Sequence, residues 1–90
     1  MIPQQAINFS KEIETLIIQE LGSKAIEKAQ LDETIAFDED TTESIPIFKF
    51  EVTLNNITRE DRRRVRNKIY DMMVDSKDPA IYMSFVFHFR

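Results

Sequence analysis

Apolar residues at every second position mark two segments of the chain, residues 45–54 and residues 80–90. A period of two is typical of a β-strand that buries one face, and both segments are rich in Phe. The apolar face of the first comprises Phe48, Phe50, Val52 and Leu54, and that of the second comprises Ile81, Met83, Phe85, Phe87 and Phe89. We predict strands over residues 45–54 and 80–90, and a short additional strand over residues 34–37.

Apolar residues at helical spacing mark the N-terminal part of the chain. From about Ser10, which can cap a helix, the stripe comprises Ile13, Leu16, Ile17 and Leu21. Gly22 interrupts it. We favour a break at Gly22, with Ser23 capping a second short helix through about Gln30; the alternative is one helix that runs through Gly22. Residues 1–9 are expected to form an N-terminal arm.

A later helix is predicted from its cap, its stripe and its end. Thr58 stands in capping position, with Asp61 three residues on. The apolar stripe comprises Val65, Ile69, Met72 and Met73. The helix is expected to end near Ser76, because Pro79 cannot continue it.

These elements predict a single small α+β domain over residues 1–90, with the order α(α)-(β)-β-α-β. The strand–helix–strand portion should be a right-handed unit with parallel strands, and the short strand should form a hairpin with its successor. Two or three strands would carry the helices on one face. Because such a sheet has long unpaired edges, we expect a homodimer to complete it.

The composition of the chain narrows the class of protein and its compartment. The chain has 90 residues, 42% of them hydrophobic, and no cysteine, which is typical of a globular protein in a reducing compartment. No segment reaches the length of a membrane span or resembles a signal peptide. We therefore expect a cytoplasmic protein that contacts no membrane and uses no cofactor.

Charge is distributed unevenly: six of the twelve Lys and Arg residues fall within residues 59–68, in a chain of net charge −4. On a helical wheel, Arg59, Arg63 and Arg66 lie with Tyr70 on one flank without an acid. Arg64 and Lys68 lie on the other flank among acids such as Asp61 and Asp71, which should neutralise them. The unbalanced flank is a candidate anion-binding surface.

An acidic loop over residues 38–44 is a second candidate surface, formed by Asp38, Glu39, Asp40 and Glu43. Its spacing does not fit a calcium loop, since Glu43 stands where glycine is required. Three readings of the arginine flank stay open. It can be a solvated helix face, it can pair with the acidic segment 32–43 in the same chain or in a dimer partner, or it can bind an external partner.

The residue inventory contains no nucleophile elbow, phosphate loop or zinc spacing, so we assign no catalytic and no metal-binding residue. We predict a small non-enzymatic interaction module, regulatory or inhibitory, that binds a protein partner through the arginine flank and the acidic loop. A nucleic-acid-binding module that uses the same arginines is the alternative, disfavoured by the overall acidity. An enzyme is the third hypothesis.

Overall fold

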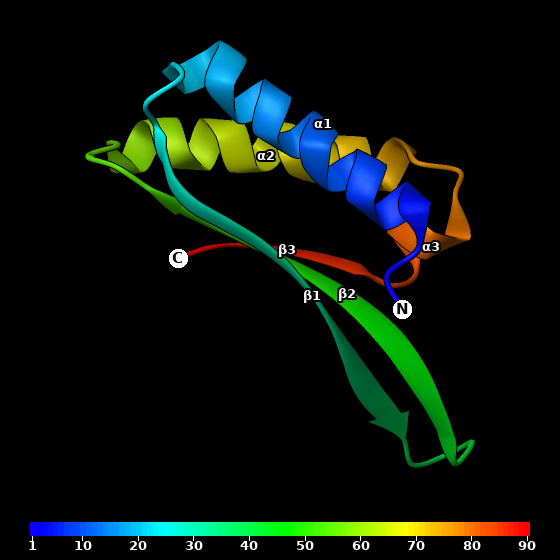
Figure 1. The fold of residues 1–90 in the computed structure, drawn as a ribbon. Helices are drawn as coiled ribbons and strands as arrows, with labels where there is room; N and C mark the ends of the chain where they lie inside the picture. Colours follow the sequence, from blue (N-terminus) through cyan, green and yellow to red (C-terminus); the bar gives the residue numbers. More distant parts are fainter.

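Two long helices lie across one face of a curved three-stranded sheet in the computed structural model, which describes residues 1–90 (Figure 1). The elements in chain order are α1 (Gln4–Leu21), β1 (Ile26–Asp38), β2 (Glu43–Leu54), α2 (Arg59–Asp75), the short α3 (Pro79–Tyr82) and β3 (Phe85–Phe89). The predicted α+β class is confirmed.

The sheet has the strand order β1-β2-β3. β1 and β2 form an antiparallel hairpin, whereas β2 and β3 are parallel, with Phe48 opposite Phe85 and Val52 opposite Phe89. The predicted hairpin and the predicted parallel strand–helix–strand unit are therefore both present. α2 provides the crossover between the two parallel strands.

The core lies between the helices and the Phe-rich face of the sheet. Its most deeply buried side chains are Phe50, Ile13, Ile17, Ile69, Val52 and Val65. Edge-to-face aromatic pairs cross this core, with ring centroids 5.1 Å apart for Phe9 and Phe85 and 4.7 Å apart for Phe87 and Phe89. The alternating and helical stripes of the sequence thus meet in one apolar layer.

The first helix begins earlier than predicted. It starts at Gln4 after Pro3, so Ser10 is not its cap; Ser10 lies within the helix, where its hydroxyl donates a hydrogen bond to the carbonyl of Ile7 (2.7 Å). Phe9 and Ala6 are buried one and two turns before Ile13, respectively, and extend its apolar face. The predicted N-terminal arm over residues 1–9 is therefore wrong for residues 4–9.

Gly22 ends α1 as predicted, but the second short helix from Ser23 to Gln30 is absent. Gly22 adopts φ 99° and ψ 160°, a conformation largely reserved for glycine. Three residues later the chain enters β1, whose ladder with β2 extends from Ile26 to Asp38. The predicted strand over residues 34–37 is the far part of this strand. Pairing along β2 outweighs the weak helical pattern of residues 23–30.

The acidic loop is shorter than predicted. Asp38 and Glu43 are the last paired residues of the hairpin, so the loop itself comprises only residues 39–42. Asp38 accepts a hydrogen bond from the amide of Asp40 (2.9 Å), and Thr42 takes a positive φ of 58°. The hydrogen bond to Asp38 tightens the turn, so that Asp38 and Glu43 themselves lie inside the strands.

Residues 34–47 form a hairpin arm that extends beyond both the helices and β3 (Figure 1). β3 begins to pair only at Phe48, so the arm is a two-stranded ribbon. The chain is accordingly elongated, with extents of 43 × 23 × 22 Å. This arm carries the acidic loop at its tip.

The final strand was predicted from Ala80, but β3 begins at Phe85. Asp78 caps α3 by accepting a hydrogen bond from the amide of Ala80 (3.0 Å), and Pro79 occupies the first helical turn. Proline in this position favours a helical start. Ile81 is therefore buried from a helix, whereas Met83, predicted on the same apolar face, is exposed.

Candidate anion-binding site

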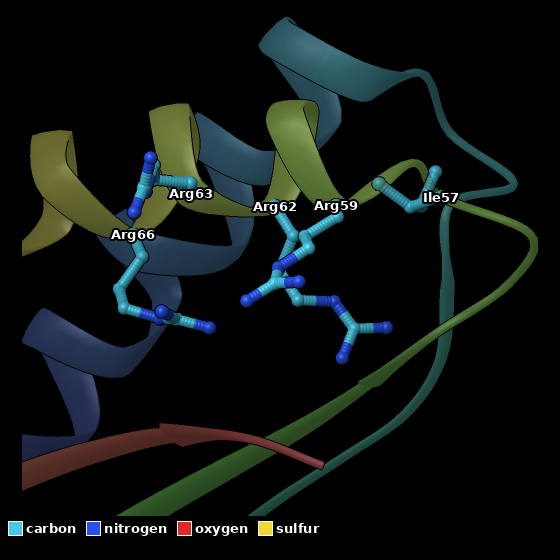
Figure 2. Close-up of a pocket in the computed structure, with 5 residues that line it drawn as sticks. All are labelled: Ile57, Arg59, Arg62, Arg63 and Arg66. Carbon is cyan, nitrogen blue, oxygen red and sulfur yellow. The ribbon is translucent and has the colours of Figure 1, made fainter.

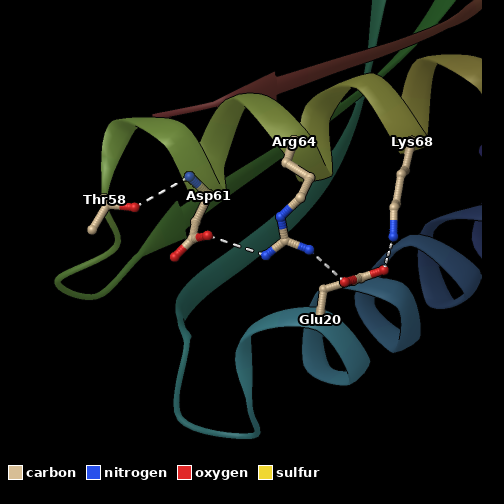
Figure 3. Close-up of polar contacts among 5 residues, drawn as sticks. All are labelled: Glu20, Thr58, Asp61, Arg64 and Lys68. Carbon is tan, nitrogen blue, oxygen red and sulfur yellow. Dashed lines mark hydrogen bonds and ion pairs between the residues drawn. The ribbon is translucent and has the colours of Figure 1, made fainter.

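The N-terminal half of α2 carries the candidate site, and its cap fixes where the helix starts. The hydroxyl of Thr58 accepts a hydrogen bond from the amide of Asp61 at 3.2 Å, as predicted (Figure 3). Because the helix starts at Arg59, the basic residues 59–68 lie on its first three turns. Val65 and Ile69 bury the opposite side of these turns against the core.

The acidic flank of α2 is neutralised, as expected, but partly by an unexpected residue. Arg64 binds Asp61 (3.1 Å) and Glu20 of α1 (2.7 Å), and Lys68 also binds Glu20 (Figure 3). Hydrogen bonds from Lys68 and then Arg64 hold the pKa of Glu20 below its usual value. The hydrogen bonds that Arg64 donates to Asp61 and Glu20 raise the pKa of Arg64. Two basic residues thus join α1 to α2 and are not available to a ligand.

The other flank of α2 forms a hollow of about 480 Å³ that is lined by Ile57, Arg59, Arg62, Arg63 and Arg66. No acid lines it, and none of its four arginines forms an ion pair within the chain. Figure 2 shows the side chains of Arg59, Arg62 and Arg66 extending from α2 to the side on which the sheet lies. We call this hollow the arginine pocket.

The floor of the arginine pocket is connected to the core through one contact. The guanidinium carbon of Arg66 lies 5.9 Å from the centre of the Phe89 ring, within the range of a cation–π interaction. Phe89 is itself buried, at the end of β3. The core therefore helps to place one guanidinium group.

A smaller adjoining hollow is lined by Arg59, Arg63 and Glu60. Glu60 forms no ion pair with either arginine. It is the one carboxylate at the margin of the arginine pocket.

The structure brings together three of the predicted site residues, Arg59, Arg63 and Arg66, and separates the others. Tyr70 is 43% exposed but does not line the pocket. Asp38, Glu39, Asp40 and Glu43 lie at the tip of the hairpin arm, far from α2 (Figure 1). These acids form no ion pair, and they do not gather into a potential metal-binding group. Pairing of the two charged regions within one chain is therefore not observed.

Arg62 lines the pocket although it was not predicted as a site residue. At 100° per residue it lies 60° from Val65, between the apolar stripe and Arg66. A position beside the stripe predicts a partly covered side chain, and Arg62 is half-buried. The helical wheel nevertheless indicates that Arg62 belongs with the pocket arginines, because it is three residues from Arg59 and four from Arg66, on one side of the helix.

Guanidinium groups bind phosphate or carboxylate through paired N–H donors and keep their charge at any physiological pH. Four of them around one hollow can also stabilise negative charge that develops on a substrate. The arginine pocket can therefore hold an anion and lower the energy of an anionic intermediate or leaving group.

No protein-family model matches the chain, and no curated protein sequence matches it. Among solved structures, it is similar to OhrB, the organic hydroperoxide resistance protein of Bacillus subtilis, with a TM-score of 0.59 and 14% sequence identity. The match covers 94% of this chain and 62% of OhrB, so the chain spans less than two thirds of OhrB's length. At this identity the match shows a shared fold.

This match contradicts two predictions. The chain was expected to be a non-enzymatic module that binds a protein partner, but its fold is that of a hydroperoxide resistance protein. The prediction that it is not an enzyme is contradicted on the same ground. Sequence motifs could not have revealed the shared fold, because the two chains are only 14% identical. No helix has the length and apolar character needed to cross a membrane.

Proposed function

We propose that this chain is the substrate-binding domain of an enzyme that acts on a small organic anion, a phosphate or carboxylate compound, in the arginine pocket. The observation that carries the proposal is a hollow of about 480 Å³ lined by four arginines and no acid. This volume lies within the usual range of small-molecule sites, roughly 300–1,000 Å³. Ile57 offers an apolar wall for the uncharged part of a substrate.

Anion titration tests this proposal. Phosphate, pyrophosphate and citrate are titrated by calorimetry at low protein concentration, with a neutral polyol as the reference ligand. Binding should raise the unfolding free energy by about 2.7 kcal/mol when the ligand concentration is 100 times Kd. The absence of heat and of stabilisation with all three anions at millimolar concentration would refute the proposal.

Matched variants localise the binding. Arg62→Gln and Arg66→Gln each remove one pocket charge. Because a hydrogen bond between charged groups contributes about 1.5–3 kcal/mol, each variant should weaken binding by a factor of roughly 10 to 150. Arg64→Gln is the control: it removes a charge from the same helix, but Arg64 is paired with Glu20 and Asp61. If Arg64→Gln weakens binding as much as Arg62→Gln does, the response reflects overall charge and the pocket is not the site.

An organic hydroperoxide is the second candidate substrate, supported by the fold shared with OhrB. The chain contains no cysteine, so its own residues include no thiolate, the usual protein group that peroxides oxidise. Two molecules of an external thiol would have to supply the two electrons, giving an alcohol, water and a disulfide. Hydroperoxide consumption with a small thiol, in wild type and in Arg62→Gln, tests this candidate. A rate equal to that of the thiol alone would exclude it.

We also propose a cytoplasmic location and a homodimeric state. The lack of cysteine supports a reducing compartment. β1 supports self-association, because it lies at the edge of the sheet with its outer side unpaired over 13 residues. Sedimentation at micromolar concentration tests the dimer, and fluorescence imaging of the tagged chain tests the location.

A further inference from the structure

The hairpin arm exposes apolar side chains that a folded monomer normally covers. Ile35 and Phe37 are 67% and 63% exposed, and both lie on the side of the arm that continues the buried face of the sheet. Neither helix reaches this far along the hairpin (Figure 1). A two-stranded ribbon is only marginally stable by itself, so the arm would gain stability from a cover.

The charges at the two ends of the molecule are complementary. The arm tip carries Asp38, Glu39, Asp40 and Glu43 without a basic residue between residues 33 and 48. The arginine pocket carries four arginines without an acid. The two groups lie towards opposite ends of a molecule 43 Å long, and no ion pair joins them. Their complementarity can be satisfied only between molecules.

A two-fold axis between two copies would bring the acidic tip and the arginine pocket together at two equivalent contacts. In such a dimer, any region of the first copy that contacts a region of the second is matched by the same contact with the two copies exchanged. Two copies with their long axes antiparallel place each acidic tip beside the partner's arginine pocket. Ile35 and Phe37 then approach the partner's Ile57 and the aliphatic stems of its arginines, which can cover apolar surface.

The surface needed is modest. A standard interface takes about 800 Å² from each partner, against a total accessible surface of 6232 Å². An arm of 14 residues and a pocket on the first turns of α2 can provide an area of that order. Opposite charges over this area would fix the register of the two copies and speed their encounter.

We propose that a second copy of this chain docks its acidic hairpin tip at the arginine pocket, forming a two-fold dimer that closes the pocket when no anionic ligand is bound. The contact rests on the charge of the same pocket as the proposed function, but it does not require that the chain be an enzyme. Ligand and partner tip compete for the same guanidinium groups. Anion binding then opens the dimer.

Charge exchange between the two surfaces tests this interface. One variant carries Glu39→Lys and Asp40→Lys, which make the tip basic; the other carries Arg62→Glu and Arg66→Glu, which make the pocket acidic. Each alone places like charges in contact and should raise the dimer dissociation constant at least roughly tenfold in sedimentation experiments at about 50 mM salt. Mixed in equal amounts, the two variants are complementary at both contacts, and a heterodimer should form.

Lys11→Glu with Lys77→Glu is the control, since both residues are exposed and lie outside the pocket and the arm. This control should dimerise as wild type does. Phe37→Ser, which leaves all charges in place, should weaken the dimer roughly tenfold or more if the arm is covered. Circular dichroism of each variant confirms that the fold is kept.

The proposal is overturned if wild type is monomeric at 200 μM in low salt, or if the mixed variants form no heterodimer. A dimer that survives both charge-reversal variants also overturns it, because the contact then lies elsewhere. Adding phosphate to the wild-type dimer should dissociate it. Anion binding is measured separately on the dilute monomer, so a chain that binds phosphate but never dimerises keeps the proposed function and loses this interface.

Discussion

Phe89 should stabilise the fold and the arginine pocket through the same ring, and substitution by Leu separates the two effects. Phe89→Leu removes an edge-to-face pair with Phe87 and the cation–π contact with Arg66. Phe85→Leu is the control: Phe85 is equally buried, at 5% exposure, and forms an edge-to-face pair with Phe9 and a tilted pair with Phe50, but it contacts no arginine.

The magnitudes follow from these contacts. Phe89→Leu loses one aromatic pair, which contributes about 0.5–1.5 kcal/mol, whereas Phe85→Leu loses two pairs, with Phe9 and with Phe50. Only Phe89→Leu also loses a cation–π contact, of about 0.5–1 kcal/mol at a partly exposed site. Because the second aromatic pair of Phe85 offsets the cation–π contact of Phe89, we expect the two substitutions to lower the unfolding free energy by similar amounts, and the coupling to Arg66 distinguishes them.

Urea unfolding of a double-mutant cycle measures the contact directly. Arg66→Gln combined with Phe89→Leu should show a coupling of about 0.5–1 kcal/mol, whereas Arg66→Gln combined with Phe85→Leu should show none. Independent sites deviate from additivity by about 0.3–0.5 kcal/mol. A coupling with Phe89 no larger than this would refute the reasoning, because the ring would then not hold the guanidinium group.

Three further predictions concern the ends and the junction of the helices. Gly22→Ala should destabilise the protein by about 1–3 kcal/mol in urea unfolding, because its backbone conformation is strained for other residues while no atom within 4 Å would obstruct a Cβ; no loss would show that the turn relaxes. Thr58→Ala should cost about 1 kcal/mol by removing the cap, whereas Thr58→Ser should keep most of the stability. The pKa of Glu20 is lowered by Lys68 and Arg64, so its contribution to stability should be present above its ordinary value of 4.5 and be lost as the pH falls through the lowered pKa. Acid unfolding of Glu20→Gln should lack this component, and an unchanged pH profile would contradict the role of the pair.

The sequence predicted the elements whose own pattern and neighbours agree. β2 and α2 were predicted within about two residues, because the apolar alternation ends at Asn55 and because Thr58 and Pro79 delimit the helix from both sides. The Phe-rich face of the sheet was predicted for the same reason. In these segments local propensity and tertiary packing favour the same structure.

β1 was predicted poorly because its pattern is set by its partner. Residues 26–38 contain four acids and few β-branched residues, which disfavours a strand. Their hydrogen bonds to β2 exist only in the folded hairpin. Its apolar alternation, Ala29, Leu31, Ile35 and Phe37, is interrupted at Glu33, and most of the strand is exposed. The start of α1 was missed differently, since Ala6 and Phe9 extend the stripe but no capping residue precedes them.

The candidate site was predicted in part because a helical wheel captures neighbours on one helix but not contacts between elements. It separated the pocket arginines from Arg64 and Lys68, yet it could not reveal that Glu20 of α1 neutralises the latter pair. It also could not place Phe89 beneath Arg66, since 23 positions and a change of element separate them. Contacts of this kind depend on the crossover from α2 to β3.

The net charge of the chain says little about the local potential at the arginine pocket. The acidity of the whole chain, −4, disfavours a nucleic-acid partner, but charges act over a limited range. The Debye length at physiological salt is about 8 Å, whereas the hairpin tip and the arginine pocket lie towards opposite ends of a 43 Å molecule. The acids of the tip therefore do little to cancel the positive potential of the pocket within one chain. An anion at the pocket experiences mainly four unpaired guanidinium groups, and only a second molecule can bring the opposing carboxylates within range.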